Sequence, residues 1–166
     1  MPKPRFLHAS RTPIALGRRF HQIARARLSE VQEPLGLRPL EFGVLIRLHD
    51  WPGQDQNTLG ERMALDRTTT SALVGRLEQQ GLIERAVNNE DRRARVLRLT
   101  AAGRRLHDAH RPDADAAQLA MLRCLSAAER RTLFELLDRV IAANEAYVRP
   151  GAGRKRPVRG VAVKVG

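Results

Sequence analysis

The sequence has only one cysteine, Cys124, among its 166 residues. A single thiol cannot form an internal disulfide bond, so the chain does not need the oxidising compartment of disulfide-stapled secreted domains. No apolar run approaches the roughly 18–20 residues of a membrane span. The first residues also lack the apolar segment of a signal peptide. We therefore expect a cytoplasmic protein.

Aromatic residues are scarce as well, at 4%, although hydrophobic residues make up 42% of the chain. The core must then be built from Leu, Val, Ile and Ala, which suits packed helices more than a β-sandwich. Catalytic motifs are missing: we find no phosphate-cradling Gly-rich loop, no Gly-x-Ser-x-Gly elbow and no paired histidine–cysteine cluster. We expect no enzymatic activity and no cofactor.

Acidic residues are in the minority, since 30 Lys and Arg against 18 Asp and Glu give a formal net charge of +12. Residues 149–166 hold six basic side chains and no acidic one, and we interpret them as a disordered basic tail. Residues 1–148 remain basic at +6, which favours a polyanionic partner such as nucleic acid. A second explanation stays open, because Arg outnumbers Lys 27 to 3, as GC-rich codon usage would give.

Apolar periodicity and capping residues predict a mainly helical chain after a loose arm over residues 1–12. The expected helices span 13–36, 39–50, 58–64 and 67–80, and two more begin at Ala101 and after Ser126. We expect Asn57 to cap the third helix and Asp66 the fourth. The gap over residues 64–66 has the length of the turn in a helix-turn-helix. Pro112 is expected to kink or interrupt the fifth helix.

Two short strands are expected at residues 82–86 and 96–99, joined by a polar, turn-prone segment. The tip of this hairpin is basic, and arginine is attracted to the negative potential of a narrow DNA minor groove. A solvated charged turn is the alternative. The fourth helix opens with a run of hydroxyl side chains, which can reach phosphates or base edges in a major groove. Our candidate DNA-contacting residues are Arg67, Thr68, Thr69, Thr70, Ser71 and Arg76 on this helix, and Asn88, Arg92, Arg93 and Arg95 on the hairpin.

Residues 37–103 resemble the MarR family of winged helix-turn-helix regulators. The stretches that carry the resemblance are 37–42, 65–70, 77–85, 90–95 and 99–103. The helices before and after them match in length and pattern, so the resemblance covers roughly residues 12–148. It implies a mainly α fold with a small β-hairpin wing, of the α+β class. It also implies a winged helix-turn-helix over 37–100 and a helical dimerisation region over 13–36 and 101–148.

The resemblance further implies a homodimer whose two winged lobes read adjacent major grooves of a palindromic, double-stranded operator. Most members are repressors that a small anionic, often aromatic, ligand releases from DNA. The ligand site usually lies where the dimerisation helices meet the DNA-binding lobe. A carboxylate ligand would need Arg or His there. We therefore take Arg18, His21 and His49, on the first two helices, as candidate ligand contacts.

Several features of the sequence have a second possible interpretation. Apolar residues of the terminal helices can form either a monomeric core or a shared interface; they are Leu16, Phe20, Ile23, Leu133, Phe134, Leu137 and Ile141. His107 and His110 are spaced as a zinc pair could be, but such spacing is common on surfaces, and we expect no metal site. The rival functions are a sequence-tolerant nucleic-acid-binding or architectural protein and, more remotely, a small enzyme that uses this histidine pair.

Overall fold

The computed structural model describes residues 8–87 and 95–148. In chain order its elements are η1 (Ala9–Arg11), α1 (Pro13–Gln32), η2 (Glu33–Leu35), α2 (Pro39–Asp50), α3 (Gln56–Arg62), α4 (Arg67–Gln79), β1 (Ile83–Val87), β2 (Arg95–Leu99), α5 (Ala101–Ala120), α6 (Ala127–Ala143) and α7 (Glu145–Val148). The two strands pair as an antiparallel hairpin. The sequence-based prediction of a mainly helical fold with one small hairpin is confirmed.

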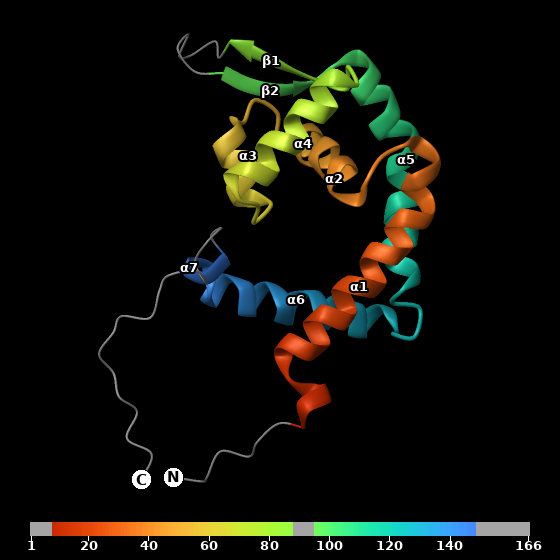
Figure 1. Ribbon diagram of the computed structural model, residues 1–166. Helices are drawn as coiled ribbons and strands as arrows, with labels where there is room; N and C mark the ends of the chain where they lie inside the picture. The colour runs from red at the N-terminus through yellow and green to blue at the C-terminus, as the bar shows by residue number, and fades with distance from the viewer. Residues whose placement is uncertain (1–7, 88–94, 149–166) are drawn as a thin grey trace, which may run out of the picture.

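Helices α2, α3 and α4 gather with the hairpin into one lobe, and α1, α5 and α6 extend away from it (Figure 1). Helix α5 packs against both α1 and α2, so it connects the lobe to the helices outside it. None of the helices in the described residues is long and apolar enough to cross a membrane.

The hydrophobic core lies inside the lobe and is built mostly from aliphatic side chains, as the scarcity of aromatics predicts. Helix α2 contributes most to this core, since Phe42, Val44, Leu45 and Leu48 are all buried and the helix contacts α4, α5 and β2. The largest fully buried apolar side chains are Phe42, Leu45 and Leu48 of α2, Leu59 of α3, Leu77 of α4, Ile83 of β1 and Leu97 of β2. The hairpin register places Ile83 opposite Leu99 and Arg85 opposite Leu97.

Capping residues determine where several helices begin. The side chain of Asp66 accepts a hydrogen bond from the Thr69 amide, Thr100 accepts from Gly103, and Ser126 accepts from Glu129. Each satisfies an amide that has no partner inside its own helix. Gly81 ends α4 in the left-handed region, at φ +70°. The predicted Asp66 cap and the predicted helix starts at Ala101 and after Ser126 are confirmed, and α4 ends within one residue of its predicted end at residue 80.

Three local predictions are wrong. The cap of α3 is Asp55, not Asn57, because the Asp55 carboxylate accepts from the Thr58 amide at 2.9 Å and the helix begins at Gln56. Helix α1 ends at Gln32, not at Gly36, since Pro34 cannot donate the next helical hydrogen bond; a 3₁₀ turn fills the gap. Pro112 does not interrupt α5, which runs from Ala101 to Ala120.

An interior proline costs a helix roughly 3 kcal/mol. Helix α5 remains helical here because packing and an ion pair hold the residues on both sides of Pro112: His107 and Ala114 are buried, and Arg111 pairs with Asp115 at 2.9 Å. Gly103, in the first turn of α5, has a different constraint. A Cβ at this position would collide with the backbone carbonyl of Leu82, so only glycine lets α5 approach the start of the hairpin this closely.

Outside the lobe, apolar side chains remain uncovered. Helix α6 has no buried residue. The exposed large apolar residues of α1 and α6 are Ile14, Leu16, Phe20, Ile23, Phe134, Leu136, Leu137, Val140 and Ile141. Large apolar side chains that are exposed in number on one helix usually mark an interaction site.

Candidate nucleic-acid interface and adjoining pocket

Helices α3 and α4 are joined by a tight turn that fixes their relative orientation. The Leu65 amide donates to the Gly60 carbonyl at 2.9 Å and the Ala64 amide donates to the Glu61 carbonyl at 3.1 Å. This pair of bonds is a Schellman motif, which needs a left-handed residue at its centre. Ala64 supplies it at φ +53°. The predicted helix-turn-helix is therefore present.

The N-terminal turn of α4 is held by Asp66, whose carboxylate accepts from both the amide and the hydroxyl of Thr69, at 2.8 and 3.0 Å. Arg67, Thr68 and Ser71 are exposed, and Thr69 is half-buried. An exposed helix N-terminus with hydroxyl and guanidinium groups suits contact with phosphates and base edges.

Thr70 differs from its neighbours and must be removed from the candidate DNA-contacting residues. Its side chain is buried, with 2% of the residue exposed. Its hydroxyl donates to the Asp66 carbonyl at 2.8 Å, and a Cβ on Gly60 would lie 2.8 Å from the same hydroxyl oxygen. Thr70 therefore packs α4 against α3 across the turn, because its helical position faces the lobe.

Arg76 also has a structural partner, which the sequence did not reveal. Its Nε lies 2.9 Å from Oε1 of Glu41, a residue that is fully buried. The other Glu41 oxygen accepts from the Arg38 amide at 2.8 Å and so caps α2. A buried carboxylate requires such partners. The Arg76 guanidinium thus compensates a charge at the start of α2, while 42% of its side chain remains exposed.

The hairpin continues from α4 and is tied to it. Arg85 of β1 donates to Glu78 of α4 at 3.2 Å and to Gln56 of α3 at 2.9 Å. Arg95, at the start of β2, is exposed opposite Val87. The predicted wing residues Asn88, Arg92 and Arg93 lie outside the described residues.

A cavity of about 830 Å³ lies where α1 meets the lobe. Its walls include His21 and Arg25 of α1, Arg38 before α2, and Thr68, Thr69 and Arg76 of α4. The lining also includes Gln118 of α5. Three arginines and one histidine face a space bordered by the helix that carries the candidate DNA contacts, so an anion bound there would touch this helix directly.

The three predicted ligand residues do not come together. His21 lines the 830 Å³ cavity, Arg18 is exposed and is not among its lining residues, and His49 lies at the other end of α2. The sequence did not reveal that Arg25, Arg38 and Gln118 line this cavity, nor that Arg76, a candidate DNA contact, does so. Arg25 follows His21 by one helical turn and so shares its face, a signal that the sequence already contained.

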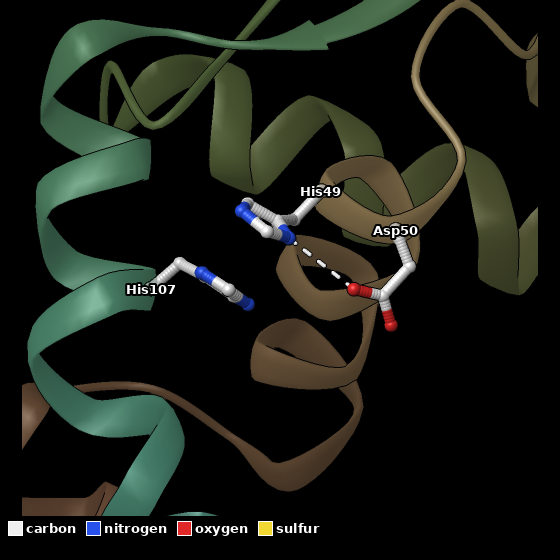
Figure 2. A group of neighbouring side chains, drawn as sticks. All are labelled: His49, Asp50 and His107. Carbon is white, nitrogen blue, oxygen red and sulfur yellow. Dashed lines mark hydrogen bonds and ion pairs between the residues drawn. The ribbon is translucent and has the colours of Figure 1, made fainter.

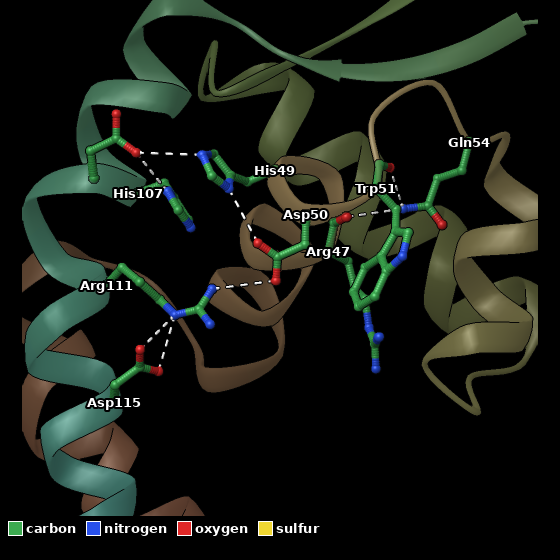
Figure 3. Close-up of polar contacts among 9 residues, drawn as sticks. Arg47, His49, Asp50, Trp51, Gln54, His107, Arg111 and Asp115 are labelled. Atoms are coloured by element: carbon green, nitrogen blue, oxygen red, sulfur yellow. Dashed lines mark hydrogen bonds and ion pairs between the residues drawn. The ribbon is translucent and has the colours of Figure 1, made fainter.

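His49 stacks instead on His107 of α5, with ring centroids 4.0 Å apart (Figure 2). It also borders a cavity of about 520 Å³ lined by Arg98 and Arg104. Asp50 beside it forms an ion pair with Arg111 at 3.5 Å, and Arg111 also pairs with Asp115 (Figure 3). Burial opposes ionisation of Asp50, but the His49 hydrogen bond and the Arg111 charge outweigh it and lower the pKa of the Asp50 carboxyl.

Comparison with known proteins agrees with this geometry. The family model described as MarR family matches residues 37–94. A putative transcriptional regulatory protein for the hcr operon of Thauera aromatica is 35% identical over 138 residues, which are 80% of this chain and 76% of that protein. Curated relatives from Bacillus subtilis and Escherichia coli, at 28% and 29% identity, are also transcriptional regulators.

Solved structures give the same result. The PcaV transcriptional regulator from Streptomyces coelicolor, in complex with its natural ligand, is 31% identical with a TM-score of 0.71, over 84% of this chain and 99% of that one. BpsR from Bordetella bronchiseptica is 26% identical with a TM-score of 0.74, over 82% of this chain and 97% of that one. Sequence, fold and the winged helix-turn-helix agree that this chain belongs to the MarR family of DNA-binding transcriptional regulators.

Proposed function

We propose that the protein is a ligand-responsive repressor that binds a palindromic operator as a homodimer and releases it when a small anion enters the 830 Å³ cavity. One observation carries this proposal: Thr68, Thr69 and Arg76 of α4 form part of the cavity wall. A ligand in contact with the DNA-reading helix can favour one position of that helix over another, and this shifts the population between DNA-binding and DNA-free states.

The proposed DNA contacts divide between helix and wing. Arg67, Thr68 and Ser71 of α4 are exposed and would enter the major groove, and Thr69 would contribute at its edge. Arg95, with the wing residues Asn88, Arg92 and Arg93, would reach the minor groove. Because this partner is chromosomal DNA, the protein would act in the bacterial cytoplasm.

A second copy of the chain is the proposed cover for the apolar surface of α1 and α6. Residues 13–36 and 101–148 would form the dimerisation region, and 37–100 the DNA-binding domain. Two lobes related by a two-fold axis match a palindrome, with half-sites about one helical turn apart. Burial of exposed residues such as Ile14, Val140 and Ile141 would supply the driving force for dimerisation.

The proposed effector is an aromatic carboxylate. Arg25 and Arg38 can pair with its carboxylate, and Leu28, Leu40 and Leu73 offer apolar wall for its ring. One similar regulator supports this class, because DNA binding by BpsR is regulated by 6-hydroxynicotinic acid. The PcaV structure, which holds its natural ligand, supports a ligand-responsive regulator more generally.

The test has two stages. Protein is first mixed with genomic fragments to select bound DNA, and affinity for the selected site and a scrambled duplex is measured by fluorescence anisotropy at physiological salt. We expect the selected site to be palindromic and bound at least about a thousandfold more tightly. Equal affinity, with a steep salt dependence, would instead favour a sequence-tolerant binder and overturn the repressor proposal.

Aromatic carboxylates are then screened by thermal shift, since a ligand that binds only the folded dimer raises its melting temperature. Hits are added to the protein–operator complex. We expect release of the operator by the same compounds that raise the melting temperature. Compounds that stabilise the protein but leave the operator bound would contradict the proposed mechanism of release.

A further inference from the structure

The end of α2 and the middle of α5 bring together a group that the regulatory function does not use. His49 and Asp50 are the last two residues of α2, and His107 faces them from α5 (Figure 2). One nitrogen of each histidine and one carboxylate oxygen all lie within 4.8 Å of one another. We refer to His49, Asp50 and His107 as the histidine cluster. It lies away from the 830 Å³ cavity, whose lining includes none of the three.

His107 is the first reason to expect a ligand here. The residue is only 3% exposed, and its Nδ1 lies 2.8 Å from Oδ1 of Asp108. This contact assigns the proton to Nδ1 and leaves the lone pair on Nε2. Nε2 is buried and has no hydrogen-bond partner in the described residues. A buried nitrogen in this state requires an explanation, and an unplaced ion is one of the standard ones.

His49 gives the second reason. Its Nε2 lies 3.8 Å from the same Asp108 oxygen, and its Nδ1 lies 3.2 Å from Oδ1 of Asp50 (Figure 3). The Nδ1–Oδ1 contact is within hydrogen-bond distance and the Nε2–Asp108 contact is beyond it, so without an ion the neutral His49 ring donates from Nδ1 to Asp50. A divalent ion can replace the proton between these two atoms, because both become metal ligands when the proton leaves.

We propose that the histidine cluster binds one divalent transition-metal ion, with Nδ1 of His49, Nε2 of His107 and a carboxylate oxygen of Asp50 as its protein ligands. Two imidazoles and one carboxylate match the donors that Zn²⁺ and its neighbours in the first transition row prefer. His49 and Asp50 are partly exposed, so the remaining coordination positions would be open to water.

The surrounding residues behave as supports for such a site. Asp108 contacts a ring nitrogen of both histidines, as carboxylates do around histidine-bound zinc. Arg111 lies 3.5 Å from Oδ2 of Asp50 and leaves Oδ1 directed toward the cluster. Ligand atoms of a tetrahedral zinc site lie about 3.3 Å apart, given bonds of about 2.0–2.1 Å. The half-exposed His49 ring would therefore move toward His107 and Asp50 on binding.

A bound ion would have a structural consequence. It would join the C-terminus of α2, inside the lobe, to α5, which leads out of the lobe. The metal would thereby stabilise the packing of α2 on α5. This proposal does not depend on the identity of the effector or on the operator.

The experiment uses untagged, full-length protein. Zn²⁺ is titrated against a chromogenic chelator, and Co²⁺ binding is followed by its visible absorption. We expect one ion per chain, and a rise in melting temperature with Zn²⁺. His49→Ala and Asp50→Asn each remove one ligand at a partly exposed position, so these variants should fold. Each should weaken Zn²⁺ at least about tenfold and abolish the Zn²⁺-dependent rise in melting temperature.

Two matched controls exclude binding elsewhere. His110→Ala removes another α5 histidine that is outside the cluster, and Cys124→Ser removes the exposed thiol. Both should bind Zn²⁺ as the wild type does. The proposal is overturned if wild-type protein does not compete with the chelator, if His49→Ala binds as tightly as wild type, or if His110→Ala loses as much affinity as His49→Ala. In the first case, the hydrogen bonds of His49 with Asp50 and of His107 with Asp108 explain the cluster.

Discussion

Arg76 Nε lies 2.9 Å from Oε1 of Glu41, so the helix that carries the candidate DNA contacts is joined by an ion pair to a fully buried carboxylate. The same carboxylate caps α2 through the Arg38 amide. The first turn of α2 and the last turn of α4 are therefore joined by one ion pair, and both of its residues line the 830 Å³ cavity. An anionic ligand would compete with Glu41 for Arg76.

Loss of the Arg76 guanidinium should destabilise the fold because it leaves the Glu41 charge buried without its partner. Breaking a buried pair costs about 3–5 kcal/mol, and the 42% exposure of the Arg76 side chain reduces our expectation for Arg76→Met to about 1–3 kcal/mol. Glu41→Gln in the same chain should recover part of this loss. Urea unfolding at one fixed protein concentration measures both. Arg67→Met, at an exposed position of α4, is the control. If the effects of Arg76→Met and Glu41→Gln on the unfolding free energy were strictly additive, the ion pair between the two residues would be contradicted.

Ser71 and Thr70 are adjacent hydroxyl residues of α4 with opposite surroundings, and they allow DNA contact and packing to be separated. Ser71→Ala changes an exposed side chain, so operator affinity should fall about tenfold while the unfolding free energy stays within about 0.5 kcal/mol. Thr70→Val removes the hydrogen bond to the Asp66 carbonyl and should cost about 1 kcal/mol of stability. Its folded fraction should bind the operator normally. Anisotropy titrations measure operator affinity, and urea unfolding measures stability. A loss of affinity in Thr70→Val with none in Ser71→Ala would show that Thr70 contacts DNA.

Two helix ends show how far the sequence could predict this fold. Gly81 ends α4 and Ala64 ends α3, and both adopt positive φ within the same Schellman hydrogen-bond pattern. A glycine in a sequence predicts a positive φ at a helix end, because glycine adopts this conformation readily, whereas an alanine does not. The turn after α4 could therefore be predicted from its residue type. The turn after α3 could be predicted only from its length and its place before Asp66.

In the candidate DNA-binding site, too, some features could be predicted from the sequence and others could not. Exposed positions of α4 could be predicted, because capping and helical periodicity place the N-terminal turn and its outer face. The burial of Thr70 and the pairing of Arg76 with Glu41 could not be predicted, since both depend on which side of α4 meets α2 and α3. Likewise, Arg18, His21 and His49 lie on the expected helices, but the sequence does not show that the rotation and ends of these helices separate them.

Ala64 yields a stability prediction of its own. A non-glycine residue in the left-handed region costs about 1–2 kcal/mol, while a new glycine adds about 0.5–1 kcal/mol of backbone entropy to the unfolded chain. Ala64→Gly should therefore raise the unfolding free energy by about 0.5–1 kcal/mol. Ala109→Gly, at an exposed position inside α5, should lower it by about 1 kcal/mol. Urea unfolding of both variants tests the prediction, and a loss of stability for Ala64→Gly would contradict it.

Asp50 gives a prediction about pH. Its carboxyl pKa is lowered in the folded protein from an ordinary value of 3.8, since the His49 hydrogen bond and the Arg111 charge outweigh the opposing effect of burial. A lowered pKa means that this stabilisation is present above the ordinary value and is lost as pH falls through the folded value. Unfolding free energy should therefore fall more steeply below about pH 4 in wild type than in Asp50→Asn. Because Asp50 and Arg111 are partly exposed, the difference should be small and should shrink with added salt. If the unfolding free energies of the wild type and Asp50→Asn had the same dependence on pH, this prediction would be contradicted.

Arg25 and Arg18 lie two helical turns apart on α1, and only Arg25 lines the 830 Å³ cavity. If an aromatic carboxylate binds there, Arg25→Ala removes one charge-assisted partner and should weaken binding by about 10- to 100-fold, since hydrogen bonds to charged groups contribute about 1.5–3 kcal/mol. The dependence of melting temperature on ligand concentration measures this affinity. Arg18→Ala is the matched control, because it removes the same charge from the same helix without changing the cavity wall. It should bind as wild type does and should still release the operator. Equal loss in both variants would mean that the charge of α1 as a whole attracts the ligand; loss in Arg18→Ala alone would place the ligand site elsewhere on α1.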